Sequence, residues 1–382
     1  MPATFQIRLG GIPIEDSMYN SIESLEIEEN ADAADALLLR VPVARTAAGD
    51  LQFVGDGKFE PHTNIVVVAT APDNSSQCLF DGFVLAWKLR VDRAAAGSHV
   101  EVWAHDASWL MNLEEKVKEW PGVTDGAVAN SIFADYGFEP DGANTTDDSP
   151  AHTEDGHTLM QRSTDLHLLR TLARRSGRIM RVACKDHPGQ RVGYFIPPSI
   201  DGDPVATLSM VDPDAWSVDA LDVEWDVMRP TAVGARQLSF AGGNPEGDVA
   251  DTDSSGLTAL DERDLATYAG KPSTLILTAA ADPSEVPQRA AAVLREAGWF
   301  VQAVGETDIG RLKAILRVGT VVAVEGAGTL HSGKWFVWSV RHIITADGHR
   351  MRFTLVRNAV GPAPSGGGLP GGLAGAVAGA LG

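Results

Sequence analysis

Two glycine-punctuated stretches, one near each end of the chain, have the same internal spacing. Gly82 precedes a long apolar segment and Gly97 lies at the turn into the next, and Gly333 and Gly348 repeat this separation of 15 residues. Each pair follows a Val-rich strand, one at Ile65–Val68 and the other at Val321–Val324. A repeat at this scale favours a duplicated β-unit. Two unrelated β-hairpins that look alike remain the alternative.

The first hundred residues have the composition and punctuation of β-strands. In the segment 83–92, apolar Trp87, Leu89 and Val91 alternate with charged residues. This alternation predicts a half-buried antiparallel strand with one face in water.

From residue 106 the hydrophobic period changes to that of helices. Caps at Asp106, Asp125 and Thr164 or Asp165 predict helices over 107–117, 125–136 and up to Ser176, the last one ending at Gly177. The third helix should bury Leu166, Leu169, Leu172 and Ala173 on one stripe.

The remainder returns to strands around one helix that begins near Asp282 and ends at Gly298. We therefore predict an α+β chain in which two antiparallel β-barrels flank a helical α/β insert. The expected units are a first barrel at 1–106, the insert at 107–215, a second barrel at 216–360 with an acidic loop at 241–273, and a Gly-rich tail at 361–382.

The formal net charge of −20 over 382 residues argues against two classes of partner. A surface this acidic repels nucleic-acid phosphates and anionic membranes. The N-terminus lacks the basic start and apolar run of a signal peptide. We expect synthesis in the cytoplasm, no classical export and no membrane insertion.

One segment matches a calcium-loop pattern in full. Asp251, Asp253, Ser255 and Glu262 stand where an EF-hand loop places its oxygen ligands. However, the Gly-rich stretch 242–247 cannot form the entering helix that such a loop needs. We therefore predict an acidic loop without a metal. The stretch 152–157 carries two His five residues apart, which is not a helix-face spacing, and a solvated loop is the preferred interpretation.

No motif for nucleophilic catalysis occurs. The chain has no Gly-x-Ser-x-Gly elbow and no phosphate-cradling Gly-rich loop, and Cys78 falls within a predicted strand. We predict a protein without a catalytic site or a cofactor.

The middle of the chain resembles the late control gene D proteins of contractile-tailed phages and the hub portion of VgrG proteins. The resemblance rests on the stretches 103–110, 120–125, 132–138 and 161–177, the last ending in Leu-Ala-x-x-x-Gly. It continues at Gly319–Val322, Gly333–Val337 and His342, so it covers roughly residues 1–360.

This resemblance implies a structural baseplate hub of a phage tail or contractile injection particle. Its two barrels would be related to the barrel of the tube protein, and a homotrimer would form a pseudo-six-fold ring. The implied partners are the inner tube protein, a spike protein and baseplate wedge proteins. VgrG proteins continue into a spike, whereas this chain continues into a Gly-rich tail, so the spike would be a separate protein.

Within that tail, Leu369, Leu373, Val377 and Leu381 recur at a spacing of four. The many glycines disfavour an isolated helix, so these residues are candidates for binding a partner. Two alternatives to a hub remain: a tail-associated cell-wall hydrolase or peptidase, and a calcium-dependent adhesion module.

Overall fold

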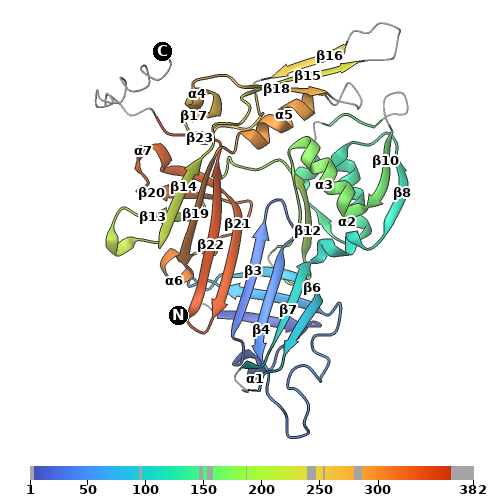
Figure 1. The fold of residues 1–382 in the computed structure, drawn as a ribbon, viewed down its shortest axis with the longest axis vertical. Coiled ribbons are helices and arrows are strands. Elements are labelled where there is room, and N and C mark those ends of the chain that lie inside the picture. The colour runs from blue at the N-terminus through green and yellow to red at the C-terminus, as the bar shows by residue number, and fades with distance from the viewer. Residues whose placement is uncertain are drawn as a thin grey trace.

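Apolar and polar residues alternate along most strands of this chain, and the computed structural model places them in one large, mainly antiparallel sheet. The structure describes residues 4–93, 97–145, 149–152, 158–185, 187–238, 247–252, 254–278 and 286–362. Among these residues, thirteen strands belong to the main sheet. Figure 1 shows the sheet rising through the molecule, with the helical insert beside its upper part.

The first part of the chain supplies eight elements, all but one of them strands. They are β1 (Thr4–Leu9), β2 (Ile12–Pro13), α1 (Asp16–Tyr19), β3 (Ser24–Asn30), β4 (Ala36–Pro42), β5 (Asn64–Thr70), β6 (Ser76–Arg90) and β7 (His99–Asp106). The predicted hairpin between Gly82 and Gly97 is present as β6 and β7, which pair antiparallel.

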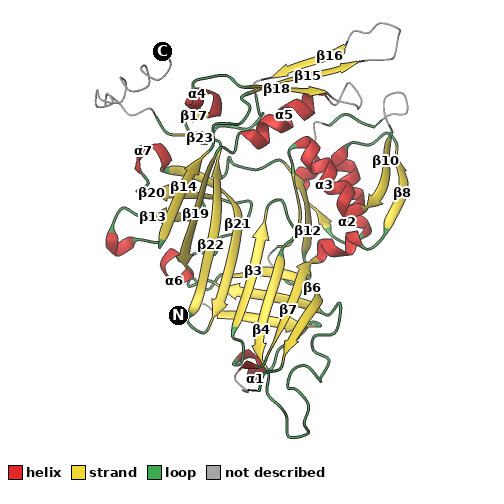
Figure 2. Cartoon of the chain, in the orientation of Figure 1, coloured by secondary structure: helices red, strands yellow, loops and turns green. Residues whose placement is uncertain are grey.

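The insert contains two α-helices, three short 3-10 or strand elements and four longer strands. They are η2 (Ala107–Asn112), β8 (Glu115–Trp120), α2 (Asp125–Asp135), β9 (Glu139–Pro140), η3 (Gly142–Thr145), β10 (Leu159–Thr164), α3 (Asp165–Ser176), β11 (Ile179–Cys184) and β12 (Arg191–Ile196). Figure 2 shows its helices lying to one side of the main sheet.

The last part of the chain forms the rest of the main sheet and a small satellite sheet. Its main-sheet strands are β13 (Thr207–Ser209), β14 (Ala220–Trp225), β19 (Val301–Asp308), β20 (Val321–Glu325), β21 (Gly333–Thr345) and β22 (Gly348–Arg357). The satellite strands are β15 (Ala232–Leu238), β16 (Gly247–Thr252) and β18 (Thr274–Thr278), and β17 (Arg263–Asp264) pairs with β23 (Ala359–Val360). The helical elements are η4 (Pro213–Ala215), α4 (Leu265–Ala269), α5 (Val286–Ala297), α6 (Ile309–Leu312) and α7 (Gly328–His331).

The main sheet consists of two runs with the same strand order. The first run is β3-β4-β7-β6-β5-β1, and the second is β14-β19-β22-β21-β20-β13. In both runs a hairpin (β6–β7 and β21–β22) lies at the centre, and the Val-rich strand pairs with the first strand of that hairpin. The runs differ at one end, because β1 pairs antiparallel with β5 whereas β13 pairs parallel with β20.

The two runs are joined edge to edge into one sheet. The second half of β21, Ser339–Ile344, pairs antiparallel with Leu25–Asn30 of β3. The prediction of two separate barrels is therefore wrong in this respect: the structure finds no closed barrel in the described part of the chain. The physical reason is that the backbone N–H and C=O groups along the edge strand β3 bond to β21 of the second run. They do not bond to β1, the strand at the far end of the same run, which would have closed a barrel.

A single hydrophobic core lies under both runs, and a second core belongs to the insert. In the insert, Thr164 caps α3 by accepting a hydrogen bond from the His167 backbone, and Gly177 ends the helix with φ of 61°. The predicted stripe is confirmed, since Leu166, Leu169, Leu172 and Ala173 are all buried.

The helix predicted over 107–117 is wrong. A 3-10 turn occupies Ala107–Asn112, and the chain then enters β8, which pairs along its full length with β10. Trp120 is buried at the end of this strand while Val117 is 82% exposed. Burial of one aromatic against β10 therefore decides the local structure over helix propensity.

Replacing Leu169 tests the packing of α3. Leu169→Ala should lower the free energy of unfolding by about 2–5 kcal/mol, because this fully buried side chain would leave a cavity. The exposed Thr171→Ala on the same helix is the control and should change stability by about 0.5 kcal/mol or less. Urea unfolding followed by far-UV circular dichroism measures both, and equal effects of the two substitutions would contradict the assignment.

Candidate functional site

One face of the main sheet is charged across both runs. The alternation in β3 buries Leu25 and Ile27 and leaves Glu26 and Glu28 on the opposite face. The register of the neighbouring strands continues this polar face from β14 to the end of β6. Its charged members are Asp222, Glu224, Glu306, Arg352, Arg350, Arg341, Glu28, Glu26, Arg40, Glu101, Lys88 and Arg90.

Side chains of opposite sign pair on this face. Arg352 and Arg350 donate to the two carboxylate oxygens of Glu306, at 2.7 and 2.9 Å, and Arg341 pairs with Glu26. Exposed ion pairs contribute only about 0–1 kcal/mol each to stability. The polar face is therefore a solvated surface of mixed charge, although the chain as a whole is strongly acidic.

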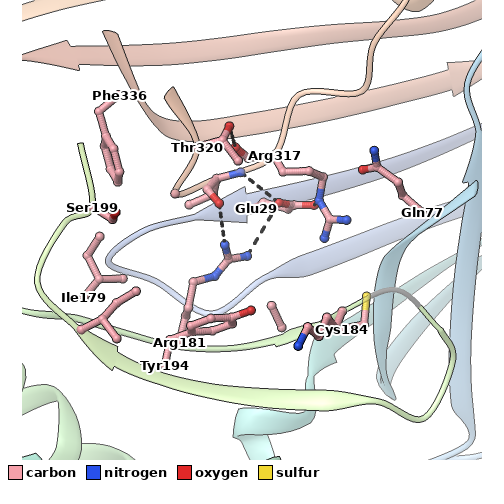
Figure 3. A pocket seen from close by; sticks show the side chains of 15 residues that line it. Glu29, Gln77, Ile179, Arg181, Cys184, Tyr194, Ser199, Arg317, Thr320 and Phe336 are labelled. Carbon is pink, nitrogen blue, oxygen red and sulfur yellow. Dashed lines mark hydrogen bonds and ion pairs between the residues drawn. The ribbon is translucent and has the colours of Figure 1, made fainter. Parts of the chain in front are cut away.

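The opposite face of the same strands packs on the hydrophobic core and is called the dry face below. Where this face meets the insert, at a contact called the seam below, it holds a buried ion-pair network. Glu29 of β3 follows the apolar positions Leu25 and Ile27 in the alternation and is fully buried. Arg317 Nε lies 2.6 Å from its Oε1 atom, and Arg181 Nη2 lies 3.7 Å from Oε2. Figure 3 shows both guanidinium groups directed at Glu29 from different parts of the chain.

Two further buried carboxyl groups, those of Asp35 and Asp106, extend the network from Arg181. Its Nη2 atom donates to Asp35 Oδ2 at 2.9 Å, and the Asp35 backbone N–H donates to Asp106 Oδ2 at 2.5 Å. The network thus joins the β3–β4 turn, β7, β11 of the insert and the loop before β20. Removing one partner would leave an uncompensated buried charge, which costs about 3–5 kcal/mol in such networks.

Burial raises the pKa of Asp35 and of Asp106, whereas the pKa of Glu29 is lowered. Burial opposes ionisation of Glu29, but Arg317, His342 and Arg181 outweigh burial and lower its pKa to about 2. Burial raises the pKa of Asp35 to about 7, despite the attraction of Arg181. Glu29 therefore carries the negative charge of the network, and Asp35 binds a proton at mildly acidic pH.

A pocket of about 450 Å³ opens beside this network. Its walls come from β11, the β12 end and the loop before β20, with Tyr194, Ser199 and Phe336 among the lining side chains (Figure 3). Cys184, also at the pocket, donates through its Sγ atom to the Cys78 carbonyl at 2.7 Å. The neighbouring Cys78 side chain and burial raise the pKa of the Cys184 thiol, which disfavours the reactive thiolate. At the seam, buried ion pairs therefore lie beside a thiol that stays protonated.

The sequence-predicted metal candidates fall partly within the described residues. Asp251 lies in β16 opposite Gly234 of β15, which is a ladder position in a sheet. Asp253 falls outside the described residues, and the Ser255 carbonyl accepts a hydrogen bond from Arg295. Glu262 lies in the turn that precedes β17. In the part of the chain that the structure describes, no group of three His, Cys, Asp or Glu side chains is placed to hold a metal ion.

The tail candidates Leu369, Leu373, Val377 and Leu381 also lie outside the described residues. The interpretation of 152–157 as a solvated loop is wrong for its first residue, since His152 is buried. Its Nε2 atom lies 2.8 Å from Asp125 Oδ1, and Arg175 contacts the same carboxylate. This second buried cluster fixes the start of α2 to α3.

The Alg8 N-terminal domain family model matches residues 2–346, which is most of the chain. The chain belongs to the Alg8 N-terminal domain family. A comparison of this family member with curated protein sequences gives no match.

Solved structures with the same fold are tail proteins and components of a secretion system. A tail protein from Neisseria meningitidis MC58 is 14% identical with a TM-score of 0.64, covering 94% of this chain and 97% of the other. The 43 kDa tail protein of prophage MuSo2 from Shewanella oneidensis is 14% identical with a TM-score of 0.65, covering 94% and 99%. The E. coli c3393 protein, a component of the type VI secretion system, is 11% identical with a TM-score of 0.56, covering 94% and 79%.

At these identities the likeness establishes the fold of this chain and no more. The fold is that of phage tail proteins and of a type VI secretion component whose own description notes similarity to phage T4 tail proteins gp27 and gp5. Membership of the late control gene D or VgrG family in particular stays a prediction. None of the helices in the described ranges has the length and apolar character needed to cross a bilayer.

The seam network gives this chain a pH-dependent stability. An unfolded Asp has a pKa of about 3.9, so between about pH 4 and pH 7 the folded chain binds more protons at Asp35 than the unfolded chain. The contribution of Asp35 to the free energy of unfolding must then fall as pH rises through this window.

Asp35→Asn should therefore make the decline in stability from pH 4 to pH 7 shallower, because an amide cannot ionise. Urea unfolding at several pH values measures the slope. Asp32→Asn, at an exposed position in the same turn, should keep the slope of the unmodified protein. If Asp35→Asn keeps that slope as well, the assignment of a buried protonated carboxyl at the seam is wrong.

Proposed function

We propose that this chain is a structural hub of a phage tail or contractile injection particle, with a mechanical and not a catalytic task. The observation that carries the proposal is the repeated six-strand order of the main sheet. One subunit then offers two similar β-modules joined side by side. One module is the run from β3 to β1, and the other is the run from β14 to β13. The likeness in fold to tail proteins supports the same conclusion.

The repeat offers a physical solution to a symmetry problem. Three subunits with two similar modules each would present six modules around one axis. Such a ring could contact a six-fold inner tube on one side and a three-fold spike on the other. In this proposal the hub is a homotrimer that joins the tube to the spike and contacts the baseplate wedge proteins around it.

The polar face of the sheet would then line the channel of the ring. A channel surface carrying Arg350, Arg352 and Glu306 in exposed ion pairs is wet and of mixed sign. Mixed sign avoids strong attraction for either basic or acidic cargo passing through. The elements packed on the opposite, buried face of the sheet, together with the insert, would form the outer wall.

The tail from residue 361 would serve the hub–spike joint. The last described residues are held in place, since the Gly361 backbone N–H donates to Leu330 and its carbonyl accepts from Arg263. The tail therefore leaves the body at a fixed point, next to β23. Leu369, Leu373, Val377 and Leu381 would bind the spike or a neighbouring subunit.

The ring proposal predicts the size of the assembled protein. Native mass spectrometry of the purified chain, or of hubs released from particles, should give three times the chain mass of 40.5 kDa. A species of one or two chains within intact particles would contradict the ring.

Removal of the tail tests its proposed role. A chain ending at Pro362 keeps the contacts of Gly361 and should fold with unchanged stability, but particles built from it should lose spike occupancy. Quantitative mass spectrometry of purified particles gives the ratio of spike to hub. Normal spike occupancy would show that the tail is a dispensable linker.

A further inference from the structure

The second half of β6 and the outer side of β14 are among the edges of the main sheet that have no partner strand in the described residues. On the side of β5, strand β6 is paired only as far as Phe83, so its second half up to Arg90 pairs with β7 alone. Strand β14 pairs only with β19. Figure 1 shows β14 and β6 on opposite flanks of the sheet, with β19, β22, β21, β3, β4 and β7 between them.

Both edges expose large apolar side chains. Trp87 on β6 is 45% exposed and Trp225 on β14 is 53% exposed. The alternation of Trp87 and Leu89 with charged residues predicts a strand with a buried face, and here Leu89 is partly buried against the main core whereas Trp87 is left exposed. Exposed strand edges with aromatic residues are sites at which another chain pairs.

The chain contains a template for what such an edge binds. In the second run, the strand equivalent to β6 is β21, and its second half is covered by β3. Both β6 and β21 carry a register shift against their hairpin partner, between Val84 and Ala86 in one and between Val337 and Ser339 in the other. When the two strands are aligned at these shifts, Lys88 is equivalent to Arg341 and Leu89 is equivalent to His342.

The strand equivalent to β3 is β14. The alignment can be extended strand by strand, through β7 and β4 in one run and through β22 and β19 in the other. It makes Leu25 equivalent to Leu221 and Ile27 equivalent to Val223. The sequences agree with this alignment, because residues 24–28 read SLEIE and residues 220–224 read ALDVE. Within one chain β3 covers β21, so β14 is the matching strand left over to cover β6.

We propose that β14 of one copy pairs antiparallel with the second half of β6 of a second copy, in the register of the β3–β21 pair. Arg341 lies opposite Glu28 and His342 opposite Ile27 in that pair. Transferred to the open edges, the same register defines four cross-strand pairs, which are Trp225 with Trp87, Glu224 with Lys88, Val223 with Leu89 and Asp222 with Arg90.

The chemistry of these pairs is complementary. On the polar face, two acidic side chains of β14 meet two basic side chains of β6, as Arg341 meets Glu26 within the chain. On the dry face, Val223 meets Leu89 and the two exposed tryptophans come together. Charged and aromatic cross-strand pairs each contribute about 0.2–1 kcal/mol, in addition to the backbone ladder. Arg90 now pairs with Asp92 of its own chain at the exposed edge, a contact of little energetic weight.

The two edges differ, so the contact is head-to-tail and closes into a ring when the rotation between copies allows it. The β3–β21 junction already sets the rotation from one module to the next. That the ring closes at three copies rests on the function proposed above. The register of the β14–β6 pair is independent of that proposal, because it is taken from the β3–β21 pair.

A short bismaleimide cross-linker tests the register on the full chain. Leu89→Cys together with Val223→Cys should give covalent trimers on a denaturing gel, because each copy supplies both halves of the contact. Each single variant should stay at the size of one chain, since Cys78 and Cys184 are buried. Leu89→Cys with Leu221→Cys, two residues out of register, should cross-link several-fold less.

Charge reversal tests the same contact without cysteines. Lys88→Glu or Glu224→Lys alone should raise the protein concentration needed for half-assembly by roughly fivefold or more, and the double variant should restore it. Lys118→Glu, on the exposed face of β8 in the insert, is the control and should leave assembly unchanged.

The outcomes separate the two proposals. Trimers that resist charge reversal and do not cross-link at positions 89 and 223 would overturn the β14–β6 contact and leave the ring intact. Cross-linked species of open-ended length would support the strand contact and contradict closure at three. A chain that stays monomeric by mass, without cross-links, would contradict both.

Discussion

The pairing of β3 with β21 is the interaction on which the rest of this structure depends. It joins two runs of equal strand order, from opposite ends of a 382-residue chain, into one continuous sheet. Because strand pairing satisfies backbone groups along a whole edge, the junction fixes the register of one run against the other. It also carries Glu29 to the point where Arg181 and Arg317 reach it from the insert and from the loop before β20. The β3–β21 pairing therefore makes the polar face continuous across both runs and positions Glu29 in the seam.

The seam adds a buried polar joint between the helical insert and the β-sheet, beside apolar contacts such as Phe83 of β6 against the insert core. Buried ion pairs are a poor source of net stability but a strict geometric requirement, since each member is costly without its partners. The excess of carboxyl groups over cations is relieved by a proton on Asp35, whose pKa burial raises to about 7. A joint of this kind suits a part that must keep one shape within a larger assembly.

Sequence reasoning located the elements whose signals are local. The Gly82 and Gly333 hairpins, the stripe of α3 and its cap at Thr164 depend on neighbouring residues and were predicted. The joining of the two runs was not, because an edge–edge contact between distant strands leaves no local period. Glu29 was also missed, although a signal exists: it occupies the apolar phase set by Leu25 and Ile27, where a charge requires a buried partner. Likewise, Trp87 follows the alternation of a buried face that a single chain does not cover.

The central claim is that the contact joining the two runs within a chain is repeated between chains. Amide hydrogen exchange measured by mass spectrometry on the dilute single chain and on the assembled protein tests it most directly. Peptides covering β3 and the second half of β21 should be protected in both states. In peptides covering 86–90 and 220–225, the amides that point away from β7 and β19 should exchange rapidly in the dilute chain and become protected together on assembly. Continued rapid exchange of either segment in the assembled protein would contradict the account.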